Sequence, residues 1–436
     1  MASVVSNPEL VNSKRGLVSR QLFMDPEIYQ TELERVYARC WLYLGHESQV
    51  KEHGDYLSNY MGEDPIILWR DGHDRVRAYL NSCLHRGMKV CRTDAGSARS
   101  FTCSYHGWTY NAEGKLTGVP YFREAYFGEL NREEWGLKEV PRVVNYGGFI
   151  FGCWDESAIS LEEYLGDVRW YLDILIERPL GRLEVLPGMQ RYKLPGNWKI
   201  QADNFAGDVY HVPFAHGSWG KTGMPIAGGV TIDNYATQKA YSFAFKHGHG
   251  ALDMRLNDET YEADLVLAQQ FGPETVDYIR ESRERLLKRL SERQARIYTW
   301  GVGNLFPNFA VNNFSAFFPV GLYLWHPKGP DKSEVWQWCA VDSAAPAAVK
   351  EMARVGFTKV QSAGGFFGQD DSDNFEQVTE ATRGVIGRRC WFNYQMGLGH
   401  EEDLQMEGYP GHVTHRMSEA NQRNFYAYWS QLMERE

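Results

Sequence analysis

Four side chains of the kinds that bind metals lie in two pairs between residues 83 and 106. Cys83 and His85 are separated by one residue, Cys103 and His106 are separated by two, and seventeen residues lie between the pairs. Thiolate and imidazole groups bind iron–sulfur clusters and zinc. The stretch therefore predicts a metal centre.

The spacing favours one kind of centre. Two cysteines and two histidines in alternating pairs are the ligands of a Rieske [2Fe–2S] cluster, in which thiolates hold one iron and imidazoles the other. A structural zinc ion is the alternative, but zinc sites usually separate paired ligands by about two to four residues. Cys83-x-His85 is closer, which suits two different irons. The cysteine inside the loop, Cys91, is expected to be a small buried residue.

A second set of candidate ligands lies between residues 204 and 216. Asn204, Asp208 and His211 are spaced by four and three residues, which places them on one face of a helix. We expect Pro213 to break that helix and to bring His216 back beside His211. Two histidines then need one carboxylate to complete the triad of a non-haem Fe(II) site. The alternative is a pair of histidines near a helix end with no metal.

The missing carboxylate is expected from residues 364–378. Glycines, Phe366 and Phe367 precede Asp370 and Asp371 at an apparent helix start. Each aspartate has an alternative role as a helix cap. We expect one to cap the helix and the other to bind iron, and the spacing does not choose between them.

The elements around the first set of ligands are predicted to be short strands separated by turns. A helix capped by Asp25 and begun by Pro26 should end near Arg39. Strands are then expected over residues 40–44, 56–60, 65–69, 75–80 and 144–151, with a turn at Asp71-Gly72. The metal ligands fall in loops that follow such strands. This pattern predicts a small all-β domain.

The remaining chain is predicted to be a larger α+β domain. We expect helices over residues 161–176 and 273–297, and a strand followed by a helix over residues 188–204. The second of these helices carries an apolar stripe of Val276, Ile279, Leu286, Leu287 and Leu290. Further strands are expected over residues 240–245, 310–318, 321–326 and 334–341. Strands covered by long helices indicate an antiparallel sheet. We place the cluster domain at residues 38–157 and the catalytic domain at residues 1–37 and 158–436.

Composition narrows the partners and the location. The net charge of −10 argues against a nucleic-acid partner, because such binding depends on Lys and Arg neutralising phosphates. No apolar run reaches the roughly eighteen residues of a membrane span, and the N-terminus lacks the apolar core of a signal peptide. We therefore expect a cytoplasmic protein that does not bind a membrane. Seven cysteines do not suggest a disulfide framework, and four are expected to be buried free thiols: Cys40, Cys153, Cys339 and Cys390.

With both ligand sets in one chain, the sequence resembles the α subunits of Rieske aromatic-ring-hydroxylating dioxygenases. This group includes the naphthalene, biphenyl, cumene and 3-phenylpropionate enzymes. The likeness covers nearly the whole chain. Its motifs, in family order, are LERVYARCWLYLGHES, YLSNYMGEDPIIL, NSCLHRGMKV, FTCSYHGWTYNAEGKL, NFAGDVYH, QDDSDNFE and MGLGHE.

The resemblance implies a role for each candidate residue. Cys83, His85, Cys103 and His106 would bind the cluster, and His211, His216 and Asp371 would bind the mononuclear Fe(II). Asp208 matches a carboxylate that hydrogen-bonds an iron-binding histidine, here His211, and a cluster-binding histidine, here His106 of the partner subunit. The alternative for Asp208 is a solvated helix carboxylate. Asn204, on the same helix face, is placed with Asp208 among the catalytic residues.

The resemblance also implies partners, fold and product. Relatives form α trimers that usually carry three small β subunits, giving α3β3. A ferredoxin and an NADH-dependent reductase supply the electrons. The catalytic domain is expected to be helix-grip-like. The expected reaction joins O2 to an aromatic ring and gives a cis-dihydrodiol.

Four residues are expected to line the substrate pocket: Phe205, Phe214, Gln361 and Phe367. Gln361 departs from the family, where an aromatic or aliphatic residue is expected six residues before Phe367. A polar group there suits a hydroxyl or carboxylate on the substrate. Gly368 also departs, since relatives often have Glu, and so does VPFAH, which replaces VGWTH.

Three functions follow from these residues. The main interpretation is a dioxygenase acting on a mono- or polycyclic aromatic. The alternative is an aromatic-acid hydroxylase of the salicylate type with the same metals. A simple electron carrier or a zinc scaffold would not need His211, His216 and Asp371.

Overall fold

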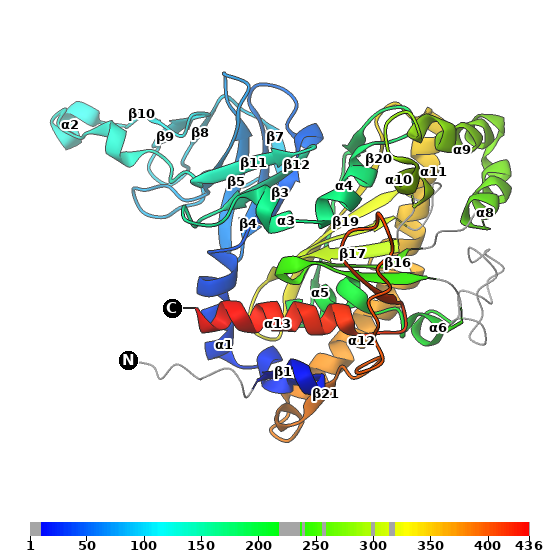
Figure 1. Ribbon diagram of the computed structural model, residues 1–436. Helices are drawn as coiled ribbons and strands as arrows, with labels where there is room; N and C mark the ends of the chain where they lie inside the picture. The colour runs from blue at the N-terminus through cyan, green and yellow to red at the C-terminus, as the bar shows by residue number, and fades with distance from the viewer. Residues whose placement is uncertain are drawn as a thin grey trace. The chain divides into compact units, whose positions relative to one another are not determined.

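The computed structural model describes residues 10–217, 236–237, 240–254, 259–297, 301–313 and 319–435 (Figure 1). The chain divides into two compact units. The smaller unit is Tyr37–Leu161, and the larger combines Met1–Val36 with Glu162–Glu436. The domain limits proposed from the sequence, residues 38 and 157, remain a prediction.

The smaller unit consists of short antiparallel strands in three sheets, ordered β6-β5-β4-β7, β10-β9-β8 and β11-β12-β3. Its one α-helix among the described residues is α2, Phe122–Tyr126. The strands are β3 Leu42–His46, β4 Asp55–Met61, β5 Asp64–Arg70, β6 Val76–Leu80, β7 Ala95–Ser97, β8 Ser100–Thr102, β9 Thr109–Asn111, β10 Leu116–Gly118, β11 Arg142–Tyr146 and β12 Phe149–Cys153.

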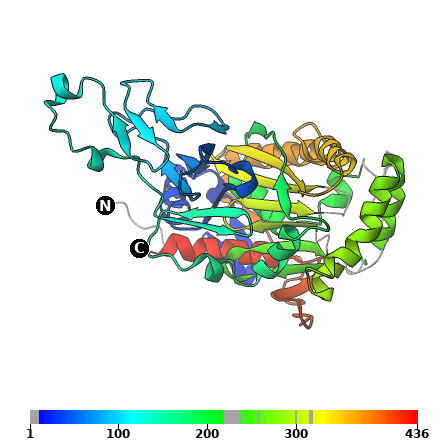
Figure 2. The ribbon, with the colours of Figure 1, turned by 90° about the horizontal axis from the view of Figure 1, so that it is seen from above.

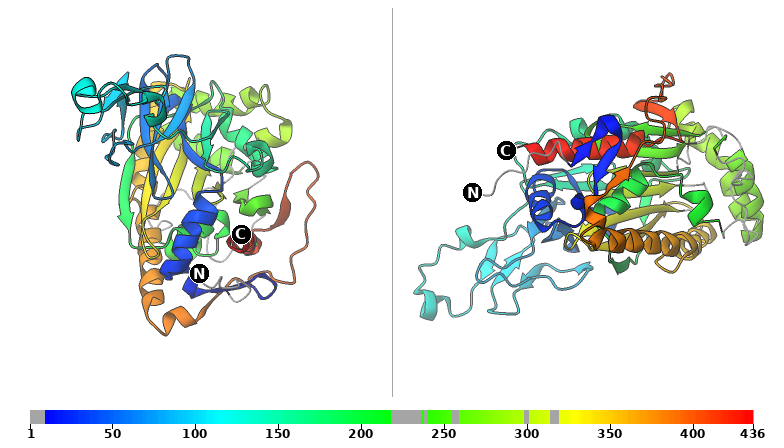
Figure 3. Two further views of the ribbon diagram at one scale, coloured as in Figure 1. Left: turned by 90° about the vertical axis from the view of Figure 1, so that its left-hand side faces the viewer. Right: turned by 90° about the horizontal axis from the view of Figure 1, so that it is seen from below.

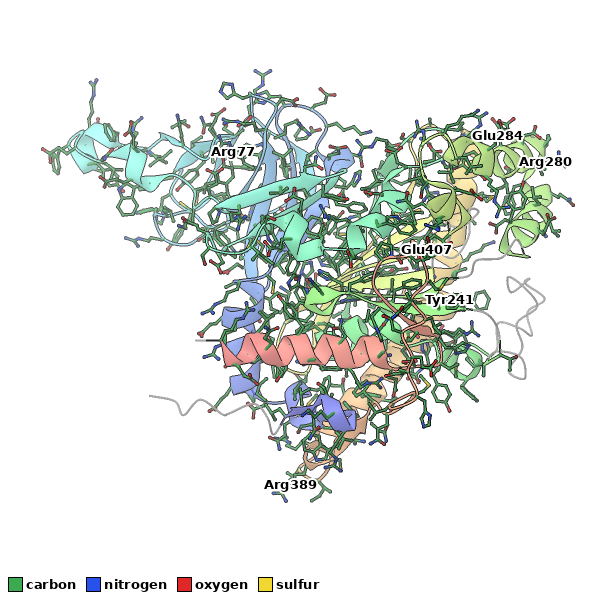
Figure 4. All side chains as sticks on the ribbon, in the orientation of Figure 1. Arg77, Tyr241, Arg280, Glu284, Arg389 and Glu407 are labelled. Carbon is green, nitrogen blue, oxygen red and sulfur yellow. The ribbon has the colours of Figure 1, made fainter. Side chains whose placement is uncertain are left out.

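The turn between β5 and β6 is fixed by one buried carboxylate. Asp71 Oδ1 accepts hydrogen bonds from the backbone N–H groups of His73 at 2.8 Å and Arg75 at 3.0 Å. Asp71 Oδ2 accepts a third from Arg77 Nε at 2.9 Å (Arg77 is labelled in Figure 4). The predicted turn at Asp71-Gly72 is confirmed, because an aspartate that binds its own following backbone favours such turns.

The prediction of a single strand over residues 144–151 was wrong, because these residues form a hairpin of β11 and β12. The chain turns back between β11 and β12 at Gly147 and Gly148, which have φ values of +61° and +104°. A Cβ at Gly148 would lie 2.4 Å from His46 Nε2. Glycine adopts such positive φ values without steric cost, and the hairpin therefore depends on this pair.

The larger unit contains a nine-stranded antiparallel sheet in the order β13-β20-β19-β18-β17-β16-β15-β22, with β14 also paired to β20. A separate three-stranded sheet joins β1 Val11–Asn12, β2 Leu17–Ser19 and β21 Trp391–Asn393. The strands of the large sheet are β13 Leu183–Val185, β14 Gln190–Leu194, β15 Tyr241–Ala244, β16 Gly250–Met254, β17 Gly301–Leu305, β18 Phe309–Asn313, β19 Val320–Pro327, β20 Ser333–Asp342 and β22 His412–His415. The predicted antiparallel sheet is confirmed.

Helices cover this sheet, and Figure 2 shows α13 in red on one side of the yellow strands and α11 in gold on the other. Helix α5 packs against β16 to β19 and against α13, and all ten of its residues are buried. The helices are α1 Pro26–Glu32, α3 Leu161–Leu165, α4 Val168–Ile176, α5 Trp198–Gly207, α6 Val212–Ala215, α8 Glu259–Ala268, α9 Pro273–Leu286, α10 Glu292–Arg296, α11 Ala347–Gln361, α12 Phe366–Arg383 and α13 Ala420–Glu434.

Several predicted helices are shorter than expected. Asp25 caps α1 by accepting a hydrogen bond from Glu27 N at 2.8 Å, as predicted, but α1 ends at Glu32 and a π-helical turn follows. The helix expected over residues 161–176 is divided at Gly166, where φ is +53°. That expected over residues 273–297 is two helices, α9 and α10. Leu287 is 47% exposed and does not belong to the apolar stripe.

The exposed face of α9 carries charged residues as expected, among them Arg280 and Glu284 (Figure 4). Of the four cysteines expected to be buried thiols, Cys390 is exposed, because it follows the end of α12 on the surface. The strand expected over residues 310–318 is β18, which ends at Asn313; residues 314–318 lie outside the described residues. No helix in the described ranges combines the length and apolar composition needed to cross a membrane.

Candidate metal centres

The candidate iron ligands of the larger unit come from two segments that flank the sheet. Helix α5 ends at Gly207, and Asp208 is the first residue beyond it, with φ −90° and ψ 101°. His211 precedes the short helix α6 and His216 follows it. Pro213 lies in the first turn of α6, a favoured position for proline. The expectation that Asp208 and His211 share one helix, broken by Pro213, was therefore wrong.

Three ligand atoms converge at this point. Oδ1 of Asp371 lies 3.4 Å from Nε2 of His211 and 3.2 Å from Nε2 of His216. Among the described residues, no other set of three histidine, cysteine or acidic side chains brings its ligand atoms within 4.8 Å of one another. The buried Oδ1 makes no hydrogen bond in the described part of the chain. Two imidazoles and one carboxylate with an unsatisfied oxygen fit a single Fe(II) ion.

Two other carboxylates hold the opposite edges of the imidazole rings. Nδ1 of His216 lies 3.2 Å from Oδ2 of Asp370, and Nδ1 of His211 lies 3.3 Å from Oδ2 of Asp208. The amide nitrogen of Asn204 lies 3.4 Å from the same His211 atom. Carboxylates in these positions fix the tautomer and the ring orientation, so that both Nε2 atoms are presented to a metal.

Neither aspartate of α12 caps the helix. The helix begins at Phe366 after Gly365, four residues before Asp370. The predicted helix start was therefore too late, and the N-cap alternative for Asp370 and Asp371 is wrong. The two aspartates instead contact different atoms. Asp370 lies beside Nδ1 of His216, whereas Asp371 lies between the Nε2 atoms of both histidines.

The charges of these side chains favour a protonated His211 beside an ionised Asp371. Burial lowers the pKa of His211, but the neighbouring carboxylates of Asp208 and Asp371 outweigh it and raise the pKa to about 10. Burial raises the pKa of Asp371, but His211 and His216 outweigh it and lower the pKa to about 2. A cation bound here would replace the proton of His211.

One of the aromatic residues expected to line the pocket lies against a ligand. The ring of Phe367 is 4.4 Å from the ring of His216. Phe205 is buried, with its ring 5.0 Å from Tyr323 and 5.0 Å from Trp325. Phe214 is 65% exposed, so the structure does not place it in a buried wall.

Gln361 is held by a residue that the sequence did not single out. Its Oε1 accepts a hydrogen bond from the Tyr323 hydroxyl at 2.9 Å, and the Tyr323 oxygen accepts another from Asn312 Nδ2 at 2.9 Å. Tyr323 and Asn312 lie on the neighbouring strands β19 and β18. No local sequence signal marks them, because the contact with Gln361 spans 38 residues.

The candidate cluster ligands lie in two similar loops of the smaller unit. In each loop a glycine N–H donates to the carbonyl of the cysteine four residues earlier, Gly87 to Cys83 at 2.8 Å and Gly107 to Cys103 at 2.9 Å. Both glycines have positive φ, +76° and +74°. The two cysteines are buried in an aromatic core that includes Tyr110, whose hydroxyl lies 3.2 Å from Cys83 Sγ.

The two histidines of these loops lie side by side. The ring centroids of His85 and His106 are 4.4 Å apart, and His85 stacks on Trp108 at 4.9 Å. The buried Nδ1 of His85 has no hydrogen-bond partner in the described part of the chain. Burial and the neighbouring His106 lower the pKa of His85, which keeps the ring neutral and able to bind a metal.

The geometry of this set fits a cluster better than a single ion. Four ligands around one zinc would have their atoms within about 4 Å of one another. The two cysteines and two histidines contain no group of three ligand atoms within 4.8 Å. Ligands spread over a wider span suit two irons bridged by sulfides. Cys91 is buried and bonds to the nearby backbone, as expected of a thiol that binds no metal.

Comparisons with known proteins agree with both centres. The family "Rieske [2Fe-2S] domain" matches residues 40–141, and the family "Ring hydroxylating alpha subunit (catalytic domain)" matches residues 161–435. The chain belongs to the ring-hydroxylating α-subunit family and is a Rieske non-haem iron oxygenase.

Individual relatives match over almost their full length. The chain is 37% identical to biphenyl 2,3-dioxygenase subunit alpha of Rhodococcus jostii, covering 98% of this chain and 90% of that one. It is 37% identical to benzene 1,2-dioxygenase subunit alpha of Pseudomonas putida, covering 97% and 92%. The crystal structure of naphthalene 1,2-dioxygenase from Rhodococcus sp. bound to indole superposes with a TM-score of 0.83 at 36% identity, covering 96% and 94%.

These matches confirm the family, the fold class and the cofactors expected from the sequence. The chain is the α subunit of a multicomponent aromatic-ring dioxygenase that uses a Rieske cluster, non-haem iron, O2 and electron-transfer partners. The zinc-scaffold and electron-carrier alternatives are wrong.

Proposed function

We propose that His211, His216 and Asp371 bind the mononuclear Fe(II) and that the chain adds both atoms of O2 to adjacent carbons of a neutral aromatic ring. The observation that carries this proposal is the convergence of two Nε2 atoms on one buried carboxylate oxygen, with the Phe367 ring against His216. We further propose that Cys83, His85, Cys103 and His106 hold the cluster. When bound, the cluster supplies single electrons and the iron activates O2.

The chain's own residues orient and shield the reaction. Asp208 and Asp370 hold the rings of His211 and His216 so that their Nε2 atoms face Asp371. Phe367 and Phe205 supply an apolar surface on which an aromatic ring can lie, which excludes water and limits wasteful reduction of O2. Asn204 adds a polar group beside His211.

A neutral ring suits the apolar side chains of the site better than an aromatic acid. The Phe367 ring lies against His216, and a substrate carboxylate would lose its hydration against such a surface. The relatives named above act on biphenyl, benzene and naphthalene, as their names state. Both observations favour the ring dioxygenase over the salicylate-type alternative.

Gln361 is proposed to select the ring substituent. Because its Oε1 already accepts the Tyr323 hydroxyl, the amide has two N–H donors left for another group. An acceptor such as a hydroxyl oxygen on the substrate would satisfy them. We therefore propose a neutral aromatic that carries an oxygen substituent as the preferred substrate.

The test is product analysis by mass spectrometry after reconstitution with a ferredoxin, a reductase and NADH. The panel pairs biphenyl and naphthalene with hydroxybiphenyl, salicylate and benzoate. We expect dihydrodiols from the neutral rings, and a Gln361→Leu variant should lose about tenfold in kcat/KM on hydroxybiphenyl but not on biphenyl. Single hydroxylation of the acids alone would overturn the dioxygenase, while equal losses on both biphenyls would overturn only the role of Gln361.

We propose an α3β3 assembly in which Asp208 contacts His106 of the partner subunit. Two observations support it. The Asp208 side chain keeps 33% of its surface exposed although it holds His211. His106 is half-buried, and the residue before it, Tyr105, is 59% exposed, as expected for a surface that another subunit covers.

A further inference from the structure

A buried acid lies one helical turn before Asp208. Asp203 of α5 is 9% exposed, and its Oδ2 accepts hydrogen bonds from the hydroxyls of Tyr394 at 2.6 Å and Tyr426 at 2.5 Å. Two tyrosines on one oxygen hold the carboxyl group firmly. Neither the family motifs nor the proposed reaction uses this arrangement.

The two tyrosines come from separate elements that are themselves anchored. Tyr426 lies on α13, and Tyr394 follows β21. Arg423 donates to the Tyr394 carbonyl at 2.6 Å and pairs with Glu401. The hydrogen bonds from Tyr394 and Tyr426 to Asp203 therefore hold the last turn of α5 in place.

That last turn carries residues of the iron site. Asn204 directly follows Asp203, and the backbone N–H of Asp208 donates to the Asn204 carbonyl at 2.9 Å. Asp208 in turn holds Nδ1 of His211. A displacement of Asp203 would be passed along the backbone to the contact between Asp208 and His211.

The charges around Asp203 are nearly all negative. The groups that act on it are the hydroxyls of Tyr394 and Tyr426 and the carboxyls of Asp208 and Glu419. Burial raises the pKa of Asp203 to about 7, the tyrosine hydrogen bonds lower it, and the charges of Asp208 and Glu419 raise it. Burial and Asp208 also raise the pKa of Glu419 to about 7, against Arg423. Because both groups are carboxyls, a negative charge on Asp203 repels a negative charge on Asp208.

We propose that Asp203 is a positioning residue for Asp208, held by Tyr394 and Tyr426, and that its charge state controls the contact between Asp208 and His211. The inference rests on the proposed role of His211 as an iron ligand. When Asp203 is neutral, it places no charge beside Asp208, and the contact between Asp208 and His211 holds. When Asp203 ionises, its negative charge repels the carboxylate of Asp208 and weakens that contact.

The prediction is an alkaline loss of activity that depends on Asp203. A group with a pKa of about 7 is about nine-tenths ionised at pH 8, so product formation per turnover should fall up to about tenfold between pH 6 and pH 8. Asp203→Asn mimics the neutral acid at every pH and should abolish the fall. The double variant Tyr394→Phe and Tyr426→Phe removes hydrogen bonds that favour the charged form, and should move the fall upward by about one pH unit.

The experiment uses the iron-loaded, chemically reduced enzyme in single turnover, which removes any pH effect on the electron donor. A second readout is the infrared band of a protonated buried carboxyl, followed against pH with and without the metals. The Asp203 contribution to this band, taken as the difference between the wild type and Asp203→Asn, should titrate near pH 7, while the contribution of Glu419 remains in both. The matched control is Trp429→Phe, which removes another buried hydrogen bond of α13, the one to Glu32 at the end of α1. It should keep the wild-type pH profile.

The outcomes separate the two proposals. An Asp203→Asn enzyme with full iron content, lower activity and an unchanged pH profile would show that Asp203 is only structural, and would overturn the inference. Absence of product from the wild type with full iron content would instead contradict the proposed function. The tyrosine variants keep the test decisive if Asp203→Asn does not fold.

Discussion

At the scale of single residues, His211 and His216 share one carboxylate but are oriented by different ones. Asp371 lies between their Nε2 atoms, whereas Asp208 and Asp370 hold one Nδ1 atom each. Each imidazole thus has one nitrogen for the metal and one for the protein. Mutation of each carboxylate should therefore have a different effect on metal binding.

Replacing Asp371 should remove one iron of three. Asp371→Ala takes away the only carboxylate between the two Nε2 atoms among the described residues, so the mononuclear iron should be lost. We expect iron analysis to fall from about three to about two irons per chain, with an unchanged cluster spectrum. Asp370→Asn is the control and should keep about three irons at saturating metal, with about 10- to 100-fold weaker binding. Full iron content in Asp371→Ala would contradict the assignment.

Binding of iron to His211, His216 and Asp371 in the apoprotein should release a proton. His211 has a pKa raised to about 10 by Asp208 and Asp371 against the effect of burial, so it is protonated at neutral pH and must lose the proton to bind iron. Affinity should therefore rise about tenfold per pH unit below the pKa of His211. Calorimetry in buffers of different ionisation enthalpy would count the protons. A pH-independent affinity between pH 6 and pH 8 would contradict the role of His211.

The sequence was informative about the ligands and about Asp208, and uninformative about the more distant residues that hold them. Spacing was enough to propose the histidines and cysteines, because metal ligands recur in fixed local patterns, whereas only the family likeness chose Asp371 over Asp370. Asp203 is joined to Tyr426 across 223 residues and Gln361 to Tyr323 across 38. Contacts of that range depend on tertiary packing and leave no local pattern.

At the scale of elements, helix α5 is held by a buried ion pair as well as by Asp203. Lys199 Nζ donates to Glu32 Oε1 at 2.6 Å, and the indole N–H groups of Trp198 and Trp429 donate to the same carboxylate at 3.0 and 2.8 Å. Figure 3 shows the blue α1, which carries Glu32, beside the red α13, which carries Trp429. Both carboxylate oxygens of the buried Glu32 thus accept hydrogen bonds.

Breaking the pair should destabilise the larger unit strongly. Lys199→Met leaves the charge of Glu32 buried, which typically costs about 3 to 5 kcal/mol. Chemical unfolding of the metal-loaded chain would measure the loss. The double variant Lys199→Met and Glu32→Gln removes both charges and should recover most of it. A double variant as unstable as the single one would show that packing, not charge, dominates.

Element boundaries followed physical features that periodicity does not reveal. The apolar pattern of residues 273–297 continues through Leu287, yet the helix stops there and Ser291 caps a new one. The strand pattern of residues 144–151 conceals a hairpin, because two glycines inside an apolar run look like strand residues. The type of each element that was predicted is confirmed, whereas its ends depended on capping and positive φ.

At the scale of the whole molecule, each unit carries one candidate metal centre, and the match to α subunits extends over both. The reaction needs electrons from another protein, and it needs both an intact cluster and an intact iron site. If Asp208 meets His106 of the partner subunit, a centre in one chain serves a centre in another. Activity would then belong to the assembly rather than to a single chain.

Complementation between inactive variants tests that arrangement. Cys103→Ser destroys the cluster, and Asp371→Ala destroys the iron site. Transfer between subunits predicts that co-assembled variants regain a measurable part of the wild-type activity, because an intact cluster can lie beside an intact iron site. Transfer within one chain predicts none. The separately purified variants, mixed without reassembly, are the control.

A ring dioxygenase places both atoms of one O2 molecule on the aromatic ring. Mass spectrometry of the product formed by the reconstituted enzyme under a mixture of ¹⁶O2 and ¹⁸O2 tests this directly. We expect product molecules with two heavy oxygens or with none. Product molecules that carry a single heavy oxygen would contradict this expectation, because they would show that the second oxygen came from water or from another O2.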